Sequence, residues 1–237
     1  VEGGYILNGT KCFITNAPIA DKITLFANTR EGGGIRGLTV FLVDADTKGI
    51  SIGKEEDKMG IRASATAEII FEDCFVPDSA RVGKEGRGFM IAMQTLQMSR
   101  PVVAAISVGI AQAAIEAAVA YSHHRKQFGV KIATFEMVQQ MIADMVMKTE
   151  AARILTYKAC VAQMNKDKKA GLYSAMSKCF ASDTAMEVTT TAVQVMGGNG
   201  YSRENPVEKY MRDAKIMQIY EGTNQVQRLV IANETTF

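Results

Sequence analysis

The chain has 237 residues, 47% of them hydrophobic, which is enough for two domains with buried cores. Its net charge of +2 and the scattered placement of Lys and Arg argue against nucleic-acid binding or attachment to a membrane surface. The longest apolar stretch, 102–119, is interrupted by Gln112 and Glu116, so we expect a buried helix there and no bilayer span.

The first 83 residues predict a β domain. Short β-branched runs at 6–7, 12–15, 23–27, 38–43, 50–52 and 67–71 alternate with turn residues. Asn8-Gly9 is a hairpin signal, and 30–37 is expected to be a glycine-rich loop. We predict part of an antiparallel barrel or sandwich domain over residues 1–85.

From residue 86 onward the pattern is typical of helices. Long stretches at 89–98, 102–124, 134–165 and 170–195 contain few residues that break helices, and positions spaced by threes and fours from 138 to 156 favour a bundle. The glycines at 197–200 should end the fourth helix, Pro206 should open a fifth, and Asn224 a sixth. The predicted fold class is therefore α+β, with an all-α domain at 86–237.

The cysteines and histidines give no metal or disulfide pattern. His123 and His124 are adjacent and face different sides of a helix, and the cysteines lack paired spacing: Cys12, Cys74, Cys160 and Cys179. We expect free thiols in a reducing compartment and no metal site.

Glu221 stands between two predicted helices and is followed by Gly222, which gives the backbone turn geometries that other residues resist. A carboxylate in an apolar crevice can act as a general base. The alternative is structural: Asn224 would cap the following helix, Gln227 would close a capping box, and Glu221 would only complement the helix dipole.

Several phrases around Glu221 occur in a fixed order along the chain. Together they resemble the C-terminal part of the acyl-CoA dehydrogenase family, of a short- or medium-chain, butyryl-CoA dehydrogenase-like kind: Arg100-Pro101-Val102, Arg125-Lys126-Gln127-Phe128-Gly129, Gln194-Val195-Met196-Gly197-Gly198 and Tyr210-Met211-Arg212-Asp213. Upstream, 11–16 and 58–66 resemble its middle β domain. The chain begins without Met, so we expect a piece of a longer polypeptide that carries an N-terminal helical domain.

The resemblance implies that Glu221 takes the α proton of an acyl-CoA thioester and that FAD accepts the β hydride. The backbone N–H of Glu221, with a flavin hydroxyl, would polarise the thioester carbonyl. Some relatives place the base just before the Arg-Pro phrase. Here that position offers no carboxylate, and the substrate is expected to lie near Gln97, Met98, Ser99, Arg100 and Gly222. Arg100 could instead be a helix-end cation.

The resemblance also implies two sets of FAD contacts. Phe13, Ile14 and Thr15 match the strand beside the flavin ring, although Phe13 could be a plain core aromatic, and Thr223 and Gln225 match contacts next to the base or else cap a helix. Positions that reach the FAD of a neighbouring subunit correspond to Arg125, Gln127, Phe128, Gln194, Val195, Met196, Gly197 and Gly198. A homo-oligomer, most naturally a tetramer, is expected. Glu136 stands where the family usually has Gln, which puts one adenosine contact in question.

These residues lead to three hypotheses about the function. The first is a flavin-dependent acyl-CoA dehydrogenase, or the same chemistry run as an enoyl-CoA reductase, with an electron-transferring flavoprotein as partner. The second is a catalytically idle assembly subunit, which the intact set of site residues disfavours. The third is an acyl-CoA oxidase, which would typically continue well beyond Phe237. The expected compartment is the bacterial cytoplasm or the mitochondrial matrix.

Overall fold

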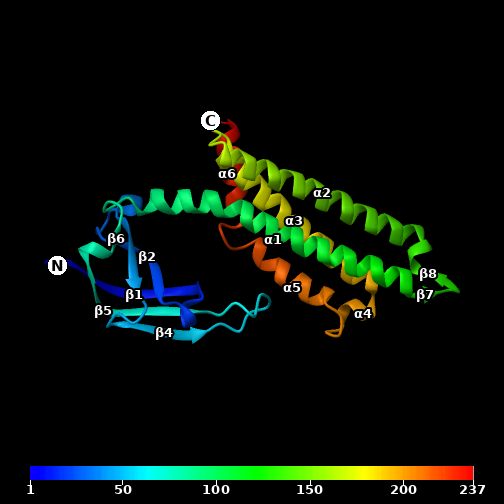
Figure 1. Ribbon diagram of the computed structural model, residues 1–237, viewed down its shortest axis with the longest axis horizontal. Helices are drawn as coiled ribbons and strands as arrows, with labels where there is room; N and C mark the ends of the chain where they lie inside the picture. The colour runs from blue at the N-terminus through cyan, green and yellow to red at the C-terminus, as the bar shows by residue number, and fades with distance from the viewer. Residues whose placement is uncertain (237) are drawn as a thin grey trace. The chain divides into compact units, whose positions relative to one another are not determined.

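A computed structural model of the chain describes residues 1–236, which divide into two compact units at Thr95/Leu96 (Figure 1). The first is built from strands and the second from helices, so the α+β class is confirmed. The expected division at residue 85 lies ten residues earlier. The helix α1 (Gly88–His124) begins inside the β unit, where Ile91 lies against Gly83.

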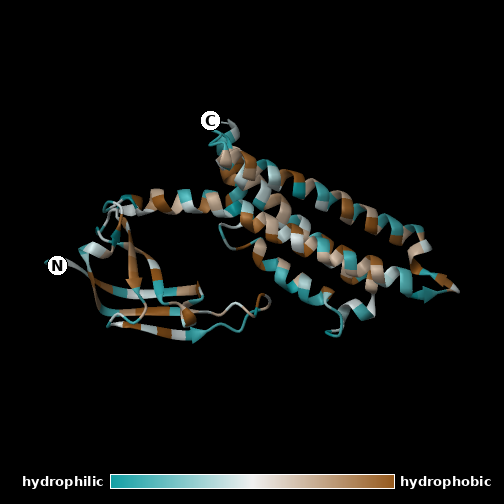
Figure 2. Ribbon diagram, viewed as in Figure 1, coloured by the Kyte–Doolittle hydropathy of each residue, from teal (hydrophilic) through white to brown (hydrophobic). Residues whose placement is uncertain are grey.

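The β unit holds two three-stranded antiparallel sheets and no closed barrel within residues 1–95. One has the order β1 (Gly4–Thr15), β5 (Thr66–Pro77), β4 (Ile50–Glu55), and the other β2 (Lys22–Asn28), β3 (Leu38–Asp44), β6 (Arg81–Val82). Short 3₁₀ turns η1, η2 and η3 cover Ala17–Ile19, Gly34–Arg36 and Asp78–Ala80. Residues of both sheets, such as Ile69 and Phe41, share one core. Figure 2 shows hydrophobic and hydrophilic residues interspersed along the strands of this unit.

The hairpin predicted at Asn8-Gly9 is wrong. Both residues lie inside the continuous strand β1, at a shift of its register against β5. The Asn8 side chain donates to Asp73 Oδ1 at 3.1 Å and accepts from the Asp73 backbone N–H at 2.8 Å. A turn-forming pair has therefore been used as a β-bulge, which cross-strand hydrogen bonds hold in place.

The helical unit packs α1 with α2 (Glu136–Met164), α3 (Ala170–Met196), α4 (Gly198–Tyr201), α5 (Val207–Met217) and α6 (Asn224–Thr236) (Figure 1). A hairpin of β7 (Lys126–Gln127) and β8 (Val130–Lys131), followed by η4 (Ile132–Thr134), joins α1 to α2. Small side chains such as Ala114, Ala185 and Ala214 dominate the core, which lets the helix backbones approach closely.

Two helices predicted at 89–98 and 102–124 form the single helix α1, which runs through Pro101. Proline has no N–H to donate to the carbonyl four residues back, which is that of Gln97. Gln163 of α2 supplies the missing donor, because its Nε2 donates to that carbonyl at 2.8 Å. A tertiary contact thus compensates the residue that would have separated the two helices.

By length and composition, α1 is also apolar enough to cross a bilayer, which the expectation for 102–119 did not allow. Of its most apolar stretch, 44% is buried, and residues such as Ala111, Ile115 and Ala118 belong to the core of the helical unit. Core packing therefore accounts for part of the apolar composition of this helix, while side chains such as Val102 and Ile106 are exposed.

Candidate active site

Glu221 lies on the bend between α5 and α6. Its φ angle is +58° and that of Gly222 is +89°, so two successive residues are in the left-handed region. For a non-glycine residue this conformation is uncommon and costs on the order of 1 kcal/mol or more unless its surroundings hold it. The bend closes where the Asn224 N–H donates to the Gln218 carbonyl at 3.0 Å.

The bend brings Glu221 to α1. Ser99 donates from its Oγ to Glu221 Oε2 at 2.5 Å, although the two residues are 122 positions apart in sequence. The next residue, Arg100, is 7% exposed, and within residues 1–236 its Nε has no hydrogen-bond partner. Burial lowers the pKa of Arg100, while the negative charge of Glu221 opposes that effect. A carboxylate, a hydroxyl and a guanidinium therefore gather at one place.

Side chains of α3 and α6 donate hydrogen bonds to the carbonyls of the bend. Gln227 Nε2 donates to the carbonyls of Glu221, at 3.3 Å, and Gly222, at 3.0 Å, and Lys178 Nζ donates to that of Gly222 at 2.8 Å. Glycine is favoured at position 222 because its φ of +89° would strain any other residue, and an added Cβ would also displace Gln227 Nε2, which it would meet at 2.5 Å. The backbone N–H of Glu221, in contrast, donates to no group among the described residues, which leaves a donor beside the carboxylate.

The predicted capping box is wrong. The Thr223 side chain accepts from the Val226 N–H at 3.3 Å and caps α6, whereas Gln227 turns back to the bend. The Asn224 side chain is buried and faces α3, as described below. Gln225 is exposed.

The most buried polar groups near Glu221 were not predicted from the sequence. Lys178 donates to Asn224 Oδ1 at 2.9 Å, and Asn224 Nδ2 donates to Asp183 Oδ1 at 2.7 Å. Burial alone would raise the pKa of Asp183, but hydrogen bonds from Arg228, Gln218 and Asn224 outweigh it and lower that pKa. The available signal was a lysine in the small-residue face of a helix, four residues from a serine on either side.

Two of the predicted substrate neighbours precede Ser99 on α1. Gln97 is half-buried, and its carbonyl is the one that Gln163 satisfies. Met98 is exposed on α1. Of the segment 97–100, Ser99 is the residue that forms a hydrogen bond with Glu221.

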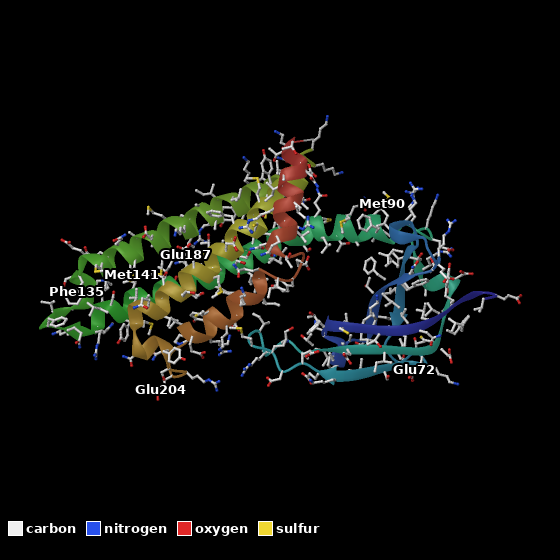
Figure 3. The ribbon with its side chains drawn as sticks, turned by 180° about the vertical axis from the view of Figure 1, so that it is seen from behind. Glu72, Met90, Phe135, Met141, Glu187 and Glu204 are labelled. Atoms are coloured by element: carbon white, nitrogen blue, oxygen red, sulfur yellow. The ribbon has the colours of Figure 1, made fainter. Side chains whose placement is uncertain are left out.

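A second cluster lies at the other end of the helical unit. A groove of about 510 Å³ is lined from α1, the β7–β8 hairpin, α2 and the end of α3; its residues include Tyr121, Arg125, Gln127, Phe135, Val195, Met196, Gly197, Gly198 and Asn199. Figure 3 labels Phe135 at the start of α2. The structure thus gathers residues that the sequence had placed in one cofactor-binding set.

The chemistry of this groove fits a phosphate-bearing ligand. The Arg125 side chain forms no ion pair or hydrogen bond within residues 1–236, so its donors are free for an anion. Gly197 has a φ of +59°, and a Cβ added at Gly197 or Gly198 would meet nothing within 4 Å. A ligand can therefore approach this backbone closely, as a glycine pair permits.

Three further residues of the predicted set lie at the edge of this region. Phe128 occupies the turn of the β7–β8 hairpin with a φ of +50° and is 94% exposed. Gln194 is exposed, and its carbonyl accepts from the Gly197 N–H at 3.2 Å. Glu136 is the exposed first residue of α2.

The predicted flavin-ring residues are in β1. Phe13 is 72% exposed and has a φ of +56°, at a second shift of the β1–β5 register, so the alternative of a plain core aromatic is wrong. Ile14 packs against the core of the sheets, and Thr15 pairs with Thr66. Such an exposed aromatic on a bulge is available to a ligand.

The described part of the chain contains no candidate metal site and no disulfide bond. No group of three His, Cys, Asp or Glu side chains is arranged to hold an ion, and all four cysteines are free thiols. Cys74 and Cys179 are buried, and burial raises the pKa of both thiols. Neither is a candidate nucleophile.

Two family models match the chain. The acyl-CoA dehydrogenase middle domain matches residues 1–74, and the acyl-CoA dehydrogenase C-terminal domain matches residues 86–235.

Individual relatives agree. A probable acyl-CoA dehydrogenase, fadE25 of Mycobacterium tuberculosis, is 50% identical over 96% of this chain and 59% of its own length. The structure of butyryl-CoA dehydrogenase from Megasphaera elsdenii is 48% identical, with a TM-score of 0.97 over 100% of this chain and 61% of that one. A chain in the structure described as the electron transferring flavoprotein of Acidaminococcus fermentans is 52% identical, with a TM-score of 0.96 over 100% of this chain and 62% of that one. The chain therefore spans about three fifths of these relatives.

Proposed function

This chain belongs to the acyl-CoA dehydrogenase family, and we propose that the protein converts a fatty or related acyl-CoA thioester to the trans-2-enoyl-CoA, with Glu221 as the catalytic base. The observation that carries the proposal is the carboxylate of Glu221 on its left-handed bend. It accepts a hydrogen bond from Ser99 and interacts electrostatically with the positive charge of Arg100. Members of this family are flavin-dependent oxidoreductases that act on CH–CH bonds.

Glu221 removes the α proton of the thioester. Its Oε2 accepts from Ser99, which orients the carboxylate and leaves the other oxygen for the substrate proton. The negative charge that develops on the thioester carbonyl is met by the free backbone N–H of Glu221. Bound FAD would supply the acceptor for the hydride that leaves the β carbon. The proton and the hydride together account for the two hydrogens that dehydrogenation removes.

Arg100 contributes a positive charge beside the base. Because its Nε lacks a partner within the described residues, this buried group can still gain a hydrogen bond when substrate or water occupies the site. Gly222 keeps the approach to the carboxylate free of a side chain. We therefore assign Arg100, Ser99 and Gly222 to the substrate side, with Gln97 and Met98 further along α1.

FAD would be held by two sets of residues. Phe13, Ile14 and Thr15 are proposed for the flavin ring, and Thr223 and Gln225 for the part next to the base. The groove between Arg125 and Gly198 would take the phosphate-bearing part of the cofactor of a neighbouring subunit, together with Gln127, Phe128 and the turn that follows Gln194. A site completed by two chains requires a homo-oligomer, and we propose a tetramer.

An electron-transferring flavoprotein is proposed as the electron partner. The support is the relative of 52% identity in a structure that is described by that name. The same residues would serve an enoyl-CoA reductase, because removal and return of the α proton pass through one base. Stoichiometric hydrogen peroxide at the rate of turnover would instead indicate an oxidase.

The test of the base is Glu221→Gln in the FAD-loaded enzyme. The amide resembles the carboxylate in shape but cannot accept the α proton, so we expect FAD to remain bound while kcat falls more than tenfold, a rise in barrier above about 1.4 kcal/mol. The measurement is the rate at which a panel of acyl-CoA substrates bleaches the flavin under anaerobic conditions.

The matched control is Glu204→Gln, on the exposed turn before α5 (Figure 3), which should leave kcat unchanged. If the Glu221 variant kept more than a tenth of the wild-type rate, another base would have to be found and the assignment would be abandoned.

A further inference from the structure

Lys178 is the most deeply buried cation near the site. It lies in the middle of α3 with a side chain that is 0% exposed. Its Nζ donates to the Gly222 carbonyl at 2.8 Å and to Asn224 Oδ1 at 2.9 Å. Within the described residues no carboxylate lies at ion-pair distance from this nitrogen. Both of its acceptors belong to the bend that carries Glu221.

Such a position is costly for an ammonium group. Burial lowers the pKa of Lys178 to about 8, with Cys179, Asp183 and Glu221 opposing this shift and Arg100 adding to it. Lysine is almost never fully buried without a charged partner, and an apolar side chain of similar volume would avoid the desolvation. The two hydrogen bonds to the bend are what this lysine provides in return.

The bend is tied to α3 on both of its sides. After Glu221, Asn224 Nδ2 donates to Ser182 Oγ at 2.8 Å and to Asp183 Oδ1 at 2.7 Å. Before Glu221, Gln218 Nε2 donates to the same oxygen of Asp183 at 2.7 Å. Lys178 binds between these two ties, at the carbonyl of Gly222, the second residue of the left-handed pair. Together with Gln227, whose Nε2 donates to the carbonyls of Glu221 and Gly222, it therefore restrains the stretch between the outer ties.

We propose that Lys178 is a positioning residue for the catalytic base, fixing the Gly222 carbonyl so that Glu221 keeps its left-handed backbone and holds its carboxylate at the α carbon of the substrate. This inference rests on the proposed function of Glu221. In this proposal Lys178 acts through the bend, because its two hydrogen bonds are made to Gly222 and Asn224. Without it, Gln227 alone holds the Gly222 carbonyl, the bend can relax toward more common backbone angles, and a displacement of about 1 Å is enough to cost a large part of the rate.

The test is Lys178→Met in the FAD-loaded enzyme, because methionine keeps most of the stem and removes both hydrogen bonds. We expect kcat to fall ten- to a hundredfold, with KM for acyl-CoA and FAD content changed less than threefold. With substrate deuterated at the α carbon, the isotope effect on kcat should increase, because proton abstraction becomes slower relative to other steps. A smaller fraction of active enzyme would lower kcat but leave the isotope effect unchanged.

Lys148→Met is the control, since that lysine makes an exposed ion pair with Glu187 in the same unit; its kcat should stay within twofold of the wild type. Lys178→Met is then combined with Glu221→Gln. If Lys178 acts through the base, it has no further effect in that background. An equal loss of kcat in both backgrounds, or an unchanged isotope effect, overturns the positioning role.

A different result would reject the proposed function itself: Glu221→Gln alone would then remain active. If Lys178→Met does not load FAD, Lys178→Gln is measured instead. This shorter amide stays polar but cannot span the distance to the Gly222 carbonyl. Wild-type kcat and isotope effect in that variant would also overturn the proposal.

Discussion

The two ends of the helical unit differ in how far their polar groups are buried and hydrogen-bonded within the chain. Around Glu221, polar groups from α3 and α6 are bonded to one another and are largely buried, as in the chain from Lys178 through Asn224 to the half-buried Asp183. Around Arg125, the polar and aromatic groups are exposed and have few partners within the chain, and Phe128 is 94% exposed. At the first end most polar groups have partners within the chain, whereas at the second, in the proposed function, they would serve a ligand and a neighbouring subunit.

This contrast has an energetic consequence. A buried polar group that loses its partner costs about 1–3 kcal/mol, and more when the group is charged, whereas an exposed group simply turns to water. Mutations at the Glu221 end should therefore reduce the stability of the fold. Mutations at the Arg125 end should reduce cofactor binding and leave the fold unchanged.

The largest expected effect is that of Asn224→Ala. It leaves the buried Lys178 ammonium with one acceptor and removes a donor from the half-buried carboxylate of Asp183. We expect the free energy of unfolding of the apoprotein to fall by about 3 kcal/mol, measured by denaturant titration. The control at the other end is Asn199→Ala, whose exposed amide donates to Tyr121 Oη, with a change within about 0.5 kcal/mol. Equal effects at the two ends would remove the contrast.

Arg125→Ala should have the reverse profile. Loss of a charged partner for phosphate should weaken FAD binding by about 1.5–3 kcal/mol, while the unfolding of the apoprotein changes by less than about 0.5 kcal/mol. Lys126→Ala removes the same charge from the adjacent residue, which does not line the groove, and should leave FAD affinity unchanged. Binding is followed by flavin fluorescence and the oligomeric state by light scattering. A monomer fully loaded with FAD would contradict the shared site.

The smallest expected effect is a pH dependence at the buried end. The pKa of Lys178 is about 8 in the fold against an ordinary 10.5, so between these values the unfolded chain binds more protons and stability rises with pH. From pH 7.5 to 9, the wild type should gain about 1 kcal/mol relative to Lys178→Met. Denaturant titrations of both proteins at the two pH values measure this difference. A difference that stays constant, or one that favours the variant as pH rises, would show that the lysine is not buried as a cation.

The sequence predicted the two classes of structure and most helix limits, because periodicity and glycine or proline signals act over a few residues. It also placed Gly197 at the end of α3 and Asn224 at the start of α6. It failed where a distant side chain changed a local preference. Gln163 lets α1 continue through Pro101, and Asp73 makes a bulge of Asn8-Gly9. No window of sequence around either site contains its partner.

The sequence by itself determined the family, the β and helical units and the candidacy of Glu221, because these follow from ordered motifs and local patterns. Only the tertiary structure decided what surrounds that carboxylate. Ser99 reaches Glu221 across 122 residues, and Lys178 reaches the following carbonyl across 44. Contacts of this kind depend on how helices pack, and a lysine in a helical pattern shows its burial only once the neighbouring helices exclude water from it.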